Sequence, residues 1–413
     1  MTLREKAQQA KQSSYSMMTL PGPVRDAALH AMADALERNA DTILEANARD
    51  VAAARENGQV EAMLDRLRLS KDRIAQMAGG LRQVAALEDP LGGEDFVAKR
   101  PNGLSIGRRR VPLGVVGIIY EARPNVTSDA LGLCVKSGNA VILRGGSEAI
   151  HSNTAVASVM AEAGYAAGLP RGCMHLVEDT SRETAAEMMQ LSGYLDVLIP
   201  RGGASLIQSV VKNATVPVIE TGVGICHTYV DATADITMAA EIVYNAKTSR
   251  PAVCNSMETL LIEERALGSH LRAIVEPLIA KNVELRGCEK TCALVPEAKA
   301  ATEEDWATEY HDYILSIRVV EGLEAAIAHI NRYGSHHSDC IVTNDYAAAE
   351  RFLNGVDAAA VYVNASTRFT DGEEFGMGAE IGISTQKLHA RGPMGLKELT
   401  SIKYVVRGSG QIR

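Results

Sequence analysis

The sequence predicts an α/β protein with two domains, each built on a parallel β-sheet. Short apolar runs rich in β-branched residues alternate with helical stretches, an arrangement typical of βαβ units. The runs are almost continuously apolar, as expected of strands that are covered on both faces of a sheet. A chain of 413 residues is also too long for one ordinary hydrophobic core.

The first domain is expected to open with helices and to continue with strands. Residues 1–88 have a helical pattern, with apolar residues at helical spacing over 24–46 and 63–87. Apolar runs then predict strands at 115–120, 140–143, 174–177, 195–199 and 216–219. Helices are predicted between them at 128–136, 153–167, 181–190 and 204–212.

A second alternating series predicts the other domain. Its strands are expected at 258–262, 283–285, 314–320, 339–343 and 358–364, and its helices at 266–280, 322–331 and 345–353. We therefore assign residues 1–223 to the first domain, 224–390 to the second and 391–413 to a C-terminal segment.

Two segments fit neither domain: a hairpin at 96–110, turning at Pro101-Asn-Gly, and a strand at 399–407. Exposed strand edges are usually covered, so we expect both segments to pair with another subunit in a homo-oligomer. The alternative is two peripheral strands of a monomer.

Composition and charge exclude several classes of protein. A hydrophobic content of 46% with 23% charged residues is typical of a soluble globular protein, and a net charge of −9 argues against a nucleic-acid partner. The chain shows no apolar signal core and no run near the ~20 residues needed to span a membrane, so we expect a cytoplasmic protein. Its seven scattered cysteines argue against a disulfide framework, and no metal site is predicted.

Cys254 is the strongest candidate for a catalytic residue. It lies between a helical stretch at 236–246 and the strand predicted at 258–262. A thiol at such a junction can be held near a helix start, where backbone N–H groups and the helix dipole favour the thiolate. A thiolate attacks a carbonyl carbon and can carry an acyl group as a thioester. The alternative is a buried structural cysteine.

Polar turns follow three of the predicted strands, at the edge where parallel sheets bind ligands. The turns are RGGS at 144–147, PRGGAS at 200–205 and ETGVG at 220–224. The helix after the second turn could accept a phosphate at its N-terminus. Because the Gly-x-Gly-x-x-Gly fingerprint is absent, each turn by itself could be a simple chain reversal.

Taken in order, these turns resemble the aldehyde dehydrogenase superfamily, in which a catalytic Glu precedes the nucleophilic Cys by 34 residues, as Glu220 precedes Cys254. The other counterparts are Asn125, Arg144, Gly202, Gly203, Glu309 and Asn364. The resemblance implies an aldehyde dehydrogenase-like α/β fold with two Rossmann-type parallel-sheet domains and a small β oligomerisation element.

Longer strings resemble the γ-glutamyl phosphate reductase (glutamate-5-semialdehyde dehydrogenase) family: VPLGVVGIIYEARPNVT at 111–127, IETGVGICH at 219–227 and KTSRPAVCN at 247–255. This resemblance implies NADPH-dependent reduction of L-glutamyl 5-phosphate to L-glutamate 5-semialdehyde in proline biosynthesis. Phosphate would leave as a thioester forms on the cysteine. A homo-oligomer is implied, and a functional association with glutamate 5-kinase is compatible with the labile substrate.

The resemblance also assigns residues to the cofactor and to the oxyanion. The cofactor is expected to contact Arg144, Gly145, Ser147, Gly202, Gly203 and Glu309. Arg144 and Ser147 replace the usual Lys and Glu, which suits a 2′-phosphate and hence NADPH, although the adjacent Glu148 could supply the missing carboxylate. Asn125 would donate an N–H to the oxyanion, unless it is only a turn residue or a helix N-cap.

Other assignments stay open. Glu220 could act in catalysis, serve the cofactor or only hold the local fold, because phosphate release needs no activated water. Arg250, Asn364 and Arg368 are expected to bind the substrate, yet a solvent-exposed position is the commoner fate of an arginine. The alternative functions are another semialdehyde dehydrogenase of the same superfamily and a non-catalytic scaffold.

Overall fold

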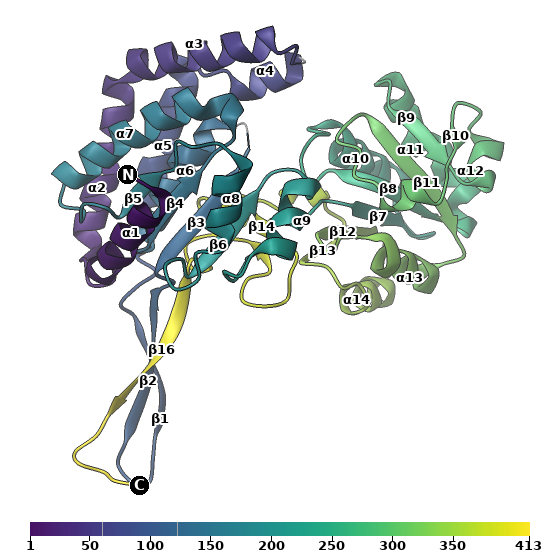
Figure 1. Ribbon diagram of the computed structural model, residues 1–413. Helices are drawn as coiled ribbons and strands as arrows, with labels where there is room; N and C mark the ends of the chain where they lie inside the picture. Colours follow the sequence, from purple (N-terminus) through teal and green to yellow (C-terminus); the bar gives the residue numbers. More distant parts are fainter. Residues whose placement is uncertain (60, 122) are drawn as a thin grey trace. The chain divides into compact units, whose positions relative to one another are not determined.

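The computed structural model describes residues 1–59, 61–121 and 123–413 and confirms the predicted α/β fold with parallel sheets (Figure 1). The chain divides into two compact units. Unit 1 comprises Met1–Glu220, Gly376–Gly382 and Met394–Arg413, and unit 2 comprises Thr221–Phe375 and Ile383–Pro393. The sequence did not indicate that the chain returns twice to unit 1 after residue 375.

Unit 1 is built on a four-stranded parallel sheet in the order β5-β4-β3-β6. The strands are β3 (Val115–Tyr120), β4 (Ala140–Arg144), β5 (Met174–Leu176) and β6 (Val197–Arg201). Every residue of β3 is buried, which explains its unbroken apolar run.

The fifth strand predicted for this sheet, at 216–219, is wrong. The segment makes one isolated bridge, between Leu198 and Val218. Leu198 N donates to Pro217 O at 2.8 Å, and Ile219 N donates to Leu198 O at 2.9 Å. Two residues further along β6, Pro200 has no N–H with which to continue the ladder.

Helices cover the sheet of unit 1, and the long helical run predicted at 24–46 is two helices. α2 ends and α3 begins at Asn39, whose backbone leaves the helical region and whose side chain donates to Ala35 O at 2.8 Å. The helices are α1 (Leu3–Met17), α2 (Gly22–Arg38), α3 (Ala40–Glu56), α4 (Glu61–Leu67), α5 (Lys71–Ala86), α6 (Pro124–Lys136), α7 (Ile150–Ala166), α8 (Arg182–Met189) and α9 (Ala204–Asn213), with a 3₁₀ turn η1 (Ser147–Ala149) before α7.

The hairpin and the late strand that fit neither predicted domain pair with each other in the same chain. β1 (Glu94–Lys99), β2 (Ser105–Pro112) and β16 (Thr400–Arg407) form an antiparallel sheet in the order β1-β2-β16, which Figure 1 shows as an extended arm. Glu94 ties the three strands together through ion pairs with Arg109 and Arg407. β1 and β16 are the edge strands of this sheet, and their pairing with another subunit stays a prediction.

Unit 2 contains a seven-stranded sheet in the order β10-β9-β11-β8-β7-β12-β13, with every pairing parallel. Its strands are β7 (Cys226–Val230), β8 (Met257–Glu263), β9 (Glu284–Gly287), β10 (Lys299–Ala300), β11 (Ile314–Val320), β12 (Ser338–Val342) and β13 (Ala360–Val363). The sequence prediction missed β7 and β10. A two-stranded pairing of β14 (Ile383–Ser384) with β15 (Gly392–Pro393) is separate from this sheet.

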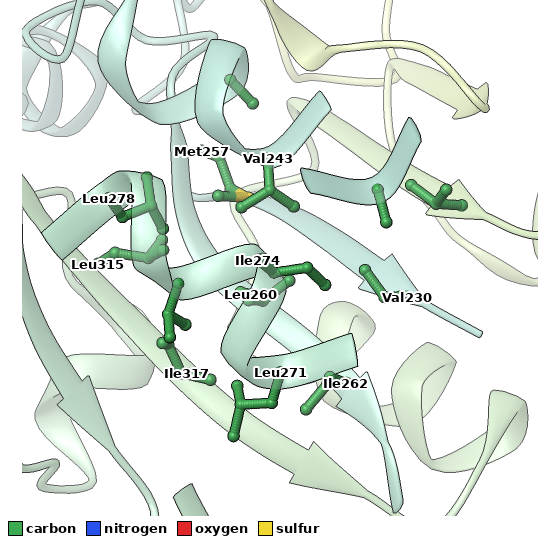
Figure 2. Packing of buried hydrophobic residues seen from close by; sticks show 14 of the residues in the cluster. Val230, Val243, Met257, Leu260, Ile262, Leu271, Ile274, Leu278, Leu315 and Ile317 are labelled. Atoms are coloured by element: carbon green, nitrogen blue, oxygen red, sulfur yellow. The ribbon is translucent and has the colours of Figure 1, made fainter. Parts of the chain in front are cut away.

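One hydrophobic core of unit 2 lies between this sheet and two of its helices, as Figure 2 shows, and a second cluster includes Tyr229, Ile330 and Phe352. Leu271, Ile274 and Leu278 of α11 pack in one cluster with residues of β8 and β11. Burial of each such side chain stabilises the fold by about 1.5–3 kcal/mol. The same cluster includes Val243 of the helix that precedes β8, so this packing holds that helix and β8 in place. The helices of unit 2 are α10 (Ile236–Thr248), α11 (Leu267–Ala280), α12 (Glu289–Leu294), α13 (Leu323–Tyr333) and α14 (Tyr346–Gly355). Within the described residues, no helix is long and apolar enough to cross a membrane.

Candidate functional site

Cys254 lies in a loop, residues 249–256, that connects α10 to β8; we call it the thiol loop. The helix ends at Thr248, and Pro251 cannot extend it. Cys254 is half-buried in the following turn. Its own segment therefore places it between a helix end and a strand start, as the sequence predicted.

Arg368 holds the thiol loop on both sides of Cys254. Its Nε donates to Ser249 Oγ at 2.8 Å, and its Nη1 donates to Asn255 Oδ1. Asn255 in turn donates to the backbone carbonyls of Arg368 at 3.2 Å and Thr370 at 2.9 Å. The structure thus shows Arg368 as part of the loop's support.

A second arginine, Arg250, is an exposed member of the same loop. Burial lowers the pKa of Arg368, and the positive charge of Arg250 lowers it further, while Cys254 acts in the opposite direction. Two of the predicted substrate-binding residues and the predicted nucleophile therefore lie close together in unit 2.

The chain that enters β7 packs directly beneath Cys254. Cys226 donates from its thiol to the Cys254 carbonyl oxygen at 3.2 Å and lies 3.7 Å from His337 Nδ1. Burial raises the pKa of Cys226 well above its usual value, so it is a neutral donor. A Cβ atom on Gly224 would overlap the backbone of Cys254, so only glycine permits this approach.

Glu309, predicted to bind the cofactor ribose, contacts this same segment. Its Oε1 accepts from Gly224 N at 3.0 Å, and its Oε2 lies 3.2 Å from His311 Nε2. The side chain is only 9% exposed. The sequence did not predict the supporting roles of Gly224 and Cys226, although a glycine just before a buried run was a usable signal for close backbone approach.

Asn364 holds the ends of two strands together. Its backbone is left-handed at φ 56°, its Nδ2 donates to Thr343 O at 2.9 Å, and its Oδ1 accepts from Thr343 N at 2.9 Å. Both polar atoms of the side chain are thus engaged by Thr343 in the β12–β13 connection and not by the thiol loop.

Asn125 of unit 1 lies in the first turn of α6 and is exposed. The N-cap is Arg123, so the interpretation of Asn125 as a cap is wrong. Its Nδ2 donates to Asp129 Oδ2 at 3.3 Å, one helical turn further on, and leaves a second N–H for another acceptor. Burial raises the pKa of Asp129 to about 6. The sequence analysis missed Asp129, although its i, i+4 spacing from Asn125 was visible.

The glycine turn after β6 can hold an anion. Gly203 is the N-cap of α9, and its N–H donates to Glu121 Oε2 at 2.9 Å. A Cβ atom on Gly202 would collide with the same carboxylate. The turn therefore presents a backbone amide to negative charge, which fits the pyrophosphate of a dinucleotide.

A cavity of about 560 Å³ lies next to this turn, and Glu121, Ser147, Glu148 and His151 are among its lining residues. It has room for part of a nucleotide, and Ser147, one of the residues predicted to contact the cofactor, lines it. Among the residues described, no group of His, Cys, Asp and Glu side chains is arranged to hold a metal ion.

The other predicted cofactor residues have local partners. Arg144 Nη2 donates to Thr180 O at 2.5 Å and to Ser181 O at 3.0 Å, and burial lowers its pKa. A side chain at Gly145 would clash with Asn153, so this glycine allows a tight turn. Glu220 is half-buried at the end of unit 1.

Comparison with known proteins identifies the family. Residues 2–305 match the model of the aldehyde dehydrogenase family. The chain is 60% identical over 411 residues to γ-glutamyl phosphate reductase of Moorella thermoacetica, covering 100% of this chain and 98% of that protein. The crystal structure of γ-glutamyl phosphate reductase from Thermotoga maritima matches with a TM-score of 0.97 and 48% identity, covering 100% and 99% of the two chains.

A more distant structure, an acetylating aldehyde dehydrogenase from Geobacillus thermoglucosidasius, shares the fold at a TM-score of 0.69 and 17% identity over 99% of this chain and 97% of that one. With a family match over most of its length and full-length relatives of high identity, this chain belongs to the aldehyde dehydrogenase family and, within it, to the γ-glutamyl phosphate reductases.

Proposed function

We propose that this oxidoreductase reduces L-glutamyl 5-phosphate to L-glutamate 5-semialdehyde, with release of phosphate, as a step of proline biosynthesis. The observation that carries the proposal is a half-buried thiol in a loop that contains Arg250 and is held by hydrogen bonds from Arg368. Sequence identity of 58–60% along almost the whole chain to proteins named γ-glutamyl phosphate reductase supports the choice of substrate.

The thiol loop would carry the covalent chemistry. The Cys254 thiolate adds to the acyl carbonyl carbon, the C–O bond to phosphate breaks, and phosphate leaves with the electron pair, which gives a thioester. Asn125 Nδ2 and the backbone N–H of Cys254 would donate to the oxygen that becomes negative. Hydride for the thioester carbon is the chemistry that a nicotinamide dinucleotide would supply if bound at the turn of Gly202 and Gly203. Departure of the Cys254 sulfur then releases the aldehyde.

The two arginines would bind the anionic ends of the substrate. Arg368 keeps the loop in place through Ser249 and Asn255, and Arg250 is exposed beside it. Burial lowers the pKa of Arg368 and the positive charge of Arg250 lowers it further, and a bound phosphate or carboxylate would favour the charged form of both guanidinium groups.

For the cofactor we propose NADPH. The turn at Gly202 and Gly203 would take the pyrophosphate in place of the Glu121 carboxylate, and the ribose would enter the cavity lined by Ser147. A serine rather than a carboxylate at 147, with Arg144 nearby in sequence, suits a 2′-phosphate. Glu148 lines the same cavity and would oppose this preference.

We also propose that the chain forms a homo-oligomer through its antiparallel arm. Ile402, Tyr404 and Val406 alternate along β16, project from one face and are exposed. Apolar side chains gathered in this way mark an interaction surface. Replacing Tyr404 and Ile402 by lysine should reduce the mass measured by light scattering; an unchanged mass would refute this assembly.

The experiment that tests the activity follows NADP⁺ reduction with glutamate 5-semialdehyde, with and without inorganic phosphate, for the wild type and Cys254→Ala. We expect strict dependence on phosphate and loss of activity in the variant. Activity that persists in Cys254→Ala would refute the mechanism. Activity that is indifferent to phosphate would favour the alternative, a hydrolytic semialdehyde dehydrogenase, with Glu220 as the residue to test next.

A further inference from the structure

A fully buried ion pair joins the two ends of the thiol loop. Lys247 lies in the last turn of α10, and Glu258 is the second residue of β8. Their Nζ and Oε2 atoms are 2.6 Å apart, and both side chains are 0% exposed. Cys254 lies between them in the chain, so the pair closes the base of the loop that presents the thiol.

A neighbouring contact reinforces the same closure. Ser256 Oγ donates to Ala246 O at 3.3 Å. Ala246 immediately precedes Lys247 in α10, and Ser256 is the last residue of the thiol loop. The side-chain pair and this hydrogen bond fix the end of α10 against the start of β8. The conformation of Cys254 is therefore set partly at the base of the loop and partly by Arg368 on its outer side.

Stability alone does not explain two charges in this position. Removing a lysine and a carboxylate from water is expensive, and apolar residues of similar volume often replace a buried pair without loss of stability. The pair is also incompletely satisfied, because Glu258 Oε1 has no hydrogen-bond partner among the described residues. Lys247 Nζ has one carboxylate partner and lies 6.0 Å from the centre of the Tyr310 ring.

The pair belongs to a buried charged group under the loop. Burial raises the pKa of Glu258 to about 7, and the carboxylate of Glu309 also raises it, whereas Lys247 and His311 lower it. Cys226 donates to the Cys254 carbonyl, and its pKa is raised first by burial and also by nearby negative charges that include Glu258. Lys247 is the cation that offsets the carboxylates of Glu258 and Glu309. The ion pair and the Cys226 hydrogen bond to the Cys254 carbonyl therefore depend on each other.

We propose that Lys247 and Glu258 are positioning residues, which hold the thiol loop in the conformation that makes Cys254 reactive. The inference rests on the proposed function only in taking Cys254 as the nucleophile. It assigns the pair to the rate of the thiol chemistry and not to substrate binding, which the arginines on the outer side of the loop would provide.

The test uses the double variant Lys247→Met/Glu258→Met, which replaces the pair by apolar side chains of similar length. We would measure Tm, kcat and KM with glutamate 5-semialdehyde, and the rate of Cys254 alkylation by iodoacetamide across pH, resolved by mass spectrometry from the other cysteines. We expect a Tm close to that of the wild type, an almost unchanged KM, and decreases of roughly tenfold or more in kcat and in alkylation rate.

Lys136→Met is the matched control. Lys136 is also a buried lysine, 2% exposed, with an acidic partner, Asp26, at 2.6 Å, but it lies at the end of α6 in unit 1. The Lys136→Met variant should have the kcat and the Cys254 alkylation rate of the wild type. Single variants, Lys247→Met and Glu258→Gln, should lose Tm as well, because each leaves one buried charge without its partner.

Two results would overturn the inference. One is a folded double variant with wild-type kcat and alkylation rate. The other is a double variant that does not fold, because the pair would then be required for the fold itself. Retained activity in Cys254→Ala would instead refute the proposed function, and the alkylation rates would still report whether the pair positions the loop.

Discussion

Gly224→Ala should disable the enzyme by moving the backbone of Cys254, the proposed nucleophile. Gly224 lies just before β7, and a Cβ atom at this position would overlap the carbonyl oxygen, the carbonyl carbon and the Cα of Cys254. Real Cβ atoms essentially never approach other heavy atoms closer than 3.0 Å. All three contacts are with backbone, so no side chain can rotate away and the loop itself must shift.

The size of that shift sets the expected effect. Relieving three overlaps with one peptide unit requires a displacement on the order of 1 Å, and a misplacement of that size can lower the rate by about 10²-fold. This corresponds to about 2.7 kcal/mol in the activation free energy. The displacement also weakens the Cys226 hydrogen bond to the Cys254 carbonyl, so the thiol should become less reactive even without substrate.

The assay compares kcat and the rate of Cys254 alkylation for the wild type, Gly224→Ala and Gly268→Ala. Gly268 is the matched control because it lies in α11 of the same unit and a Cβ atom there would meet nothing within 4 Å. We expect Gly268→Ala to retain full activity with an equal or higher Tm. Wild-type kcat and alkylation in a folded Gly224→Ala variant would refute the reasoning.

Three other predictions concern separate parts of the site. Arg250→Ala should raise the KM for phosphate in the semialdehyde assay by roughly tenfold, since an exposed cation is lost while Arg368 still holds the loop; an unchanged KM would exclude Arg250 from substrate binding. Asp129, with its pKa raised to about 6, is a stronger acceptor for Asn125 when it is ionised above that pH, so kcat should fall below pH 6 and Asp129→Asn should abolish this limb. The raised pKa means that the folded protein binds the Asp129 proton more tightly than the unfolded chain does, so the free energy of unfolding should decrease as pH rises from about 4 to about 6. Denaturant titrations of Asp129→Asn should lack this pH dependence. Ser147→Glu should shift the preference from NADPH toward NADH, and a constant ratio of the two kcat/KM values would rule out Ser147 as the determinant.

The apolar runs predicted most strands because a fully buried parallel strand must be apolar along its whole length. β3 and β8 coincide with their predicted runs within a residue or two at each end. The prediction failed where pairing depended on a neighbouring strand. Residues 216–219 have an apolar composition, yet Pro200 on β6 prevents a continuous ladder. β7 was overlooked because its residues, Cys226–Val230, include polar side chains that are buried only in the sheet.

By itself, the sequence determined the family and the α/β class and predicted Cys254 as the nucleophile, since local composition and the spacing of Glu220 and Cys254 are properties of one continuous chain. Only the tertiary structure decided what supports the thiol. Gly224 lies 30 residues before Cys254 and Arg368 more than a hundred after it, and no periodicity connects them. These contacts exist because β7, β8 and the segment after β13 meet at one end of a sheet, and chain distance does not encode that meeting.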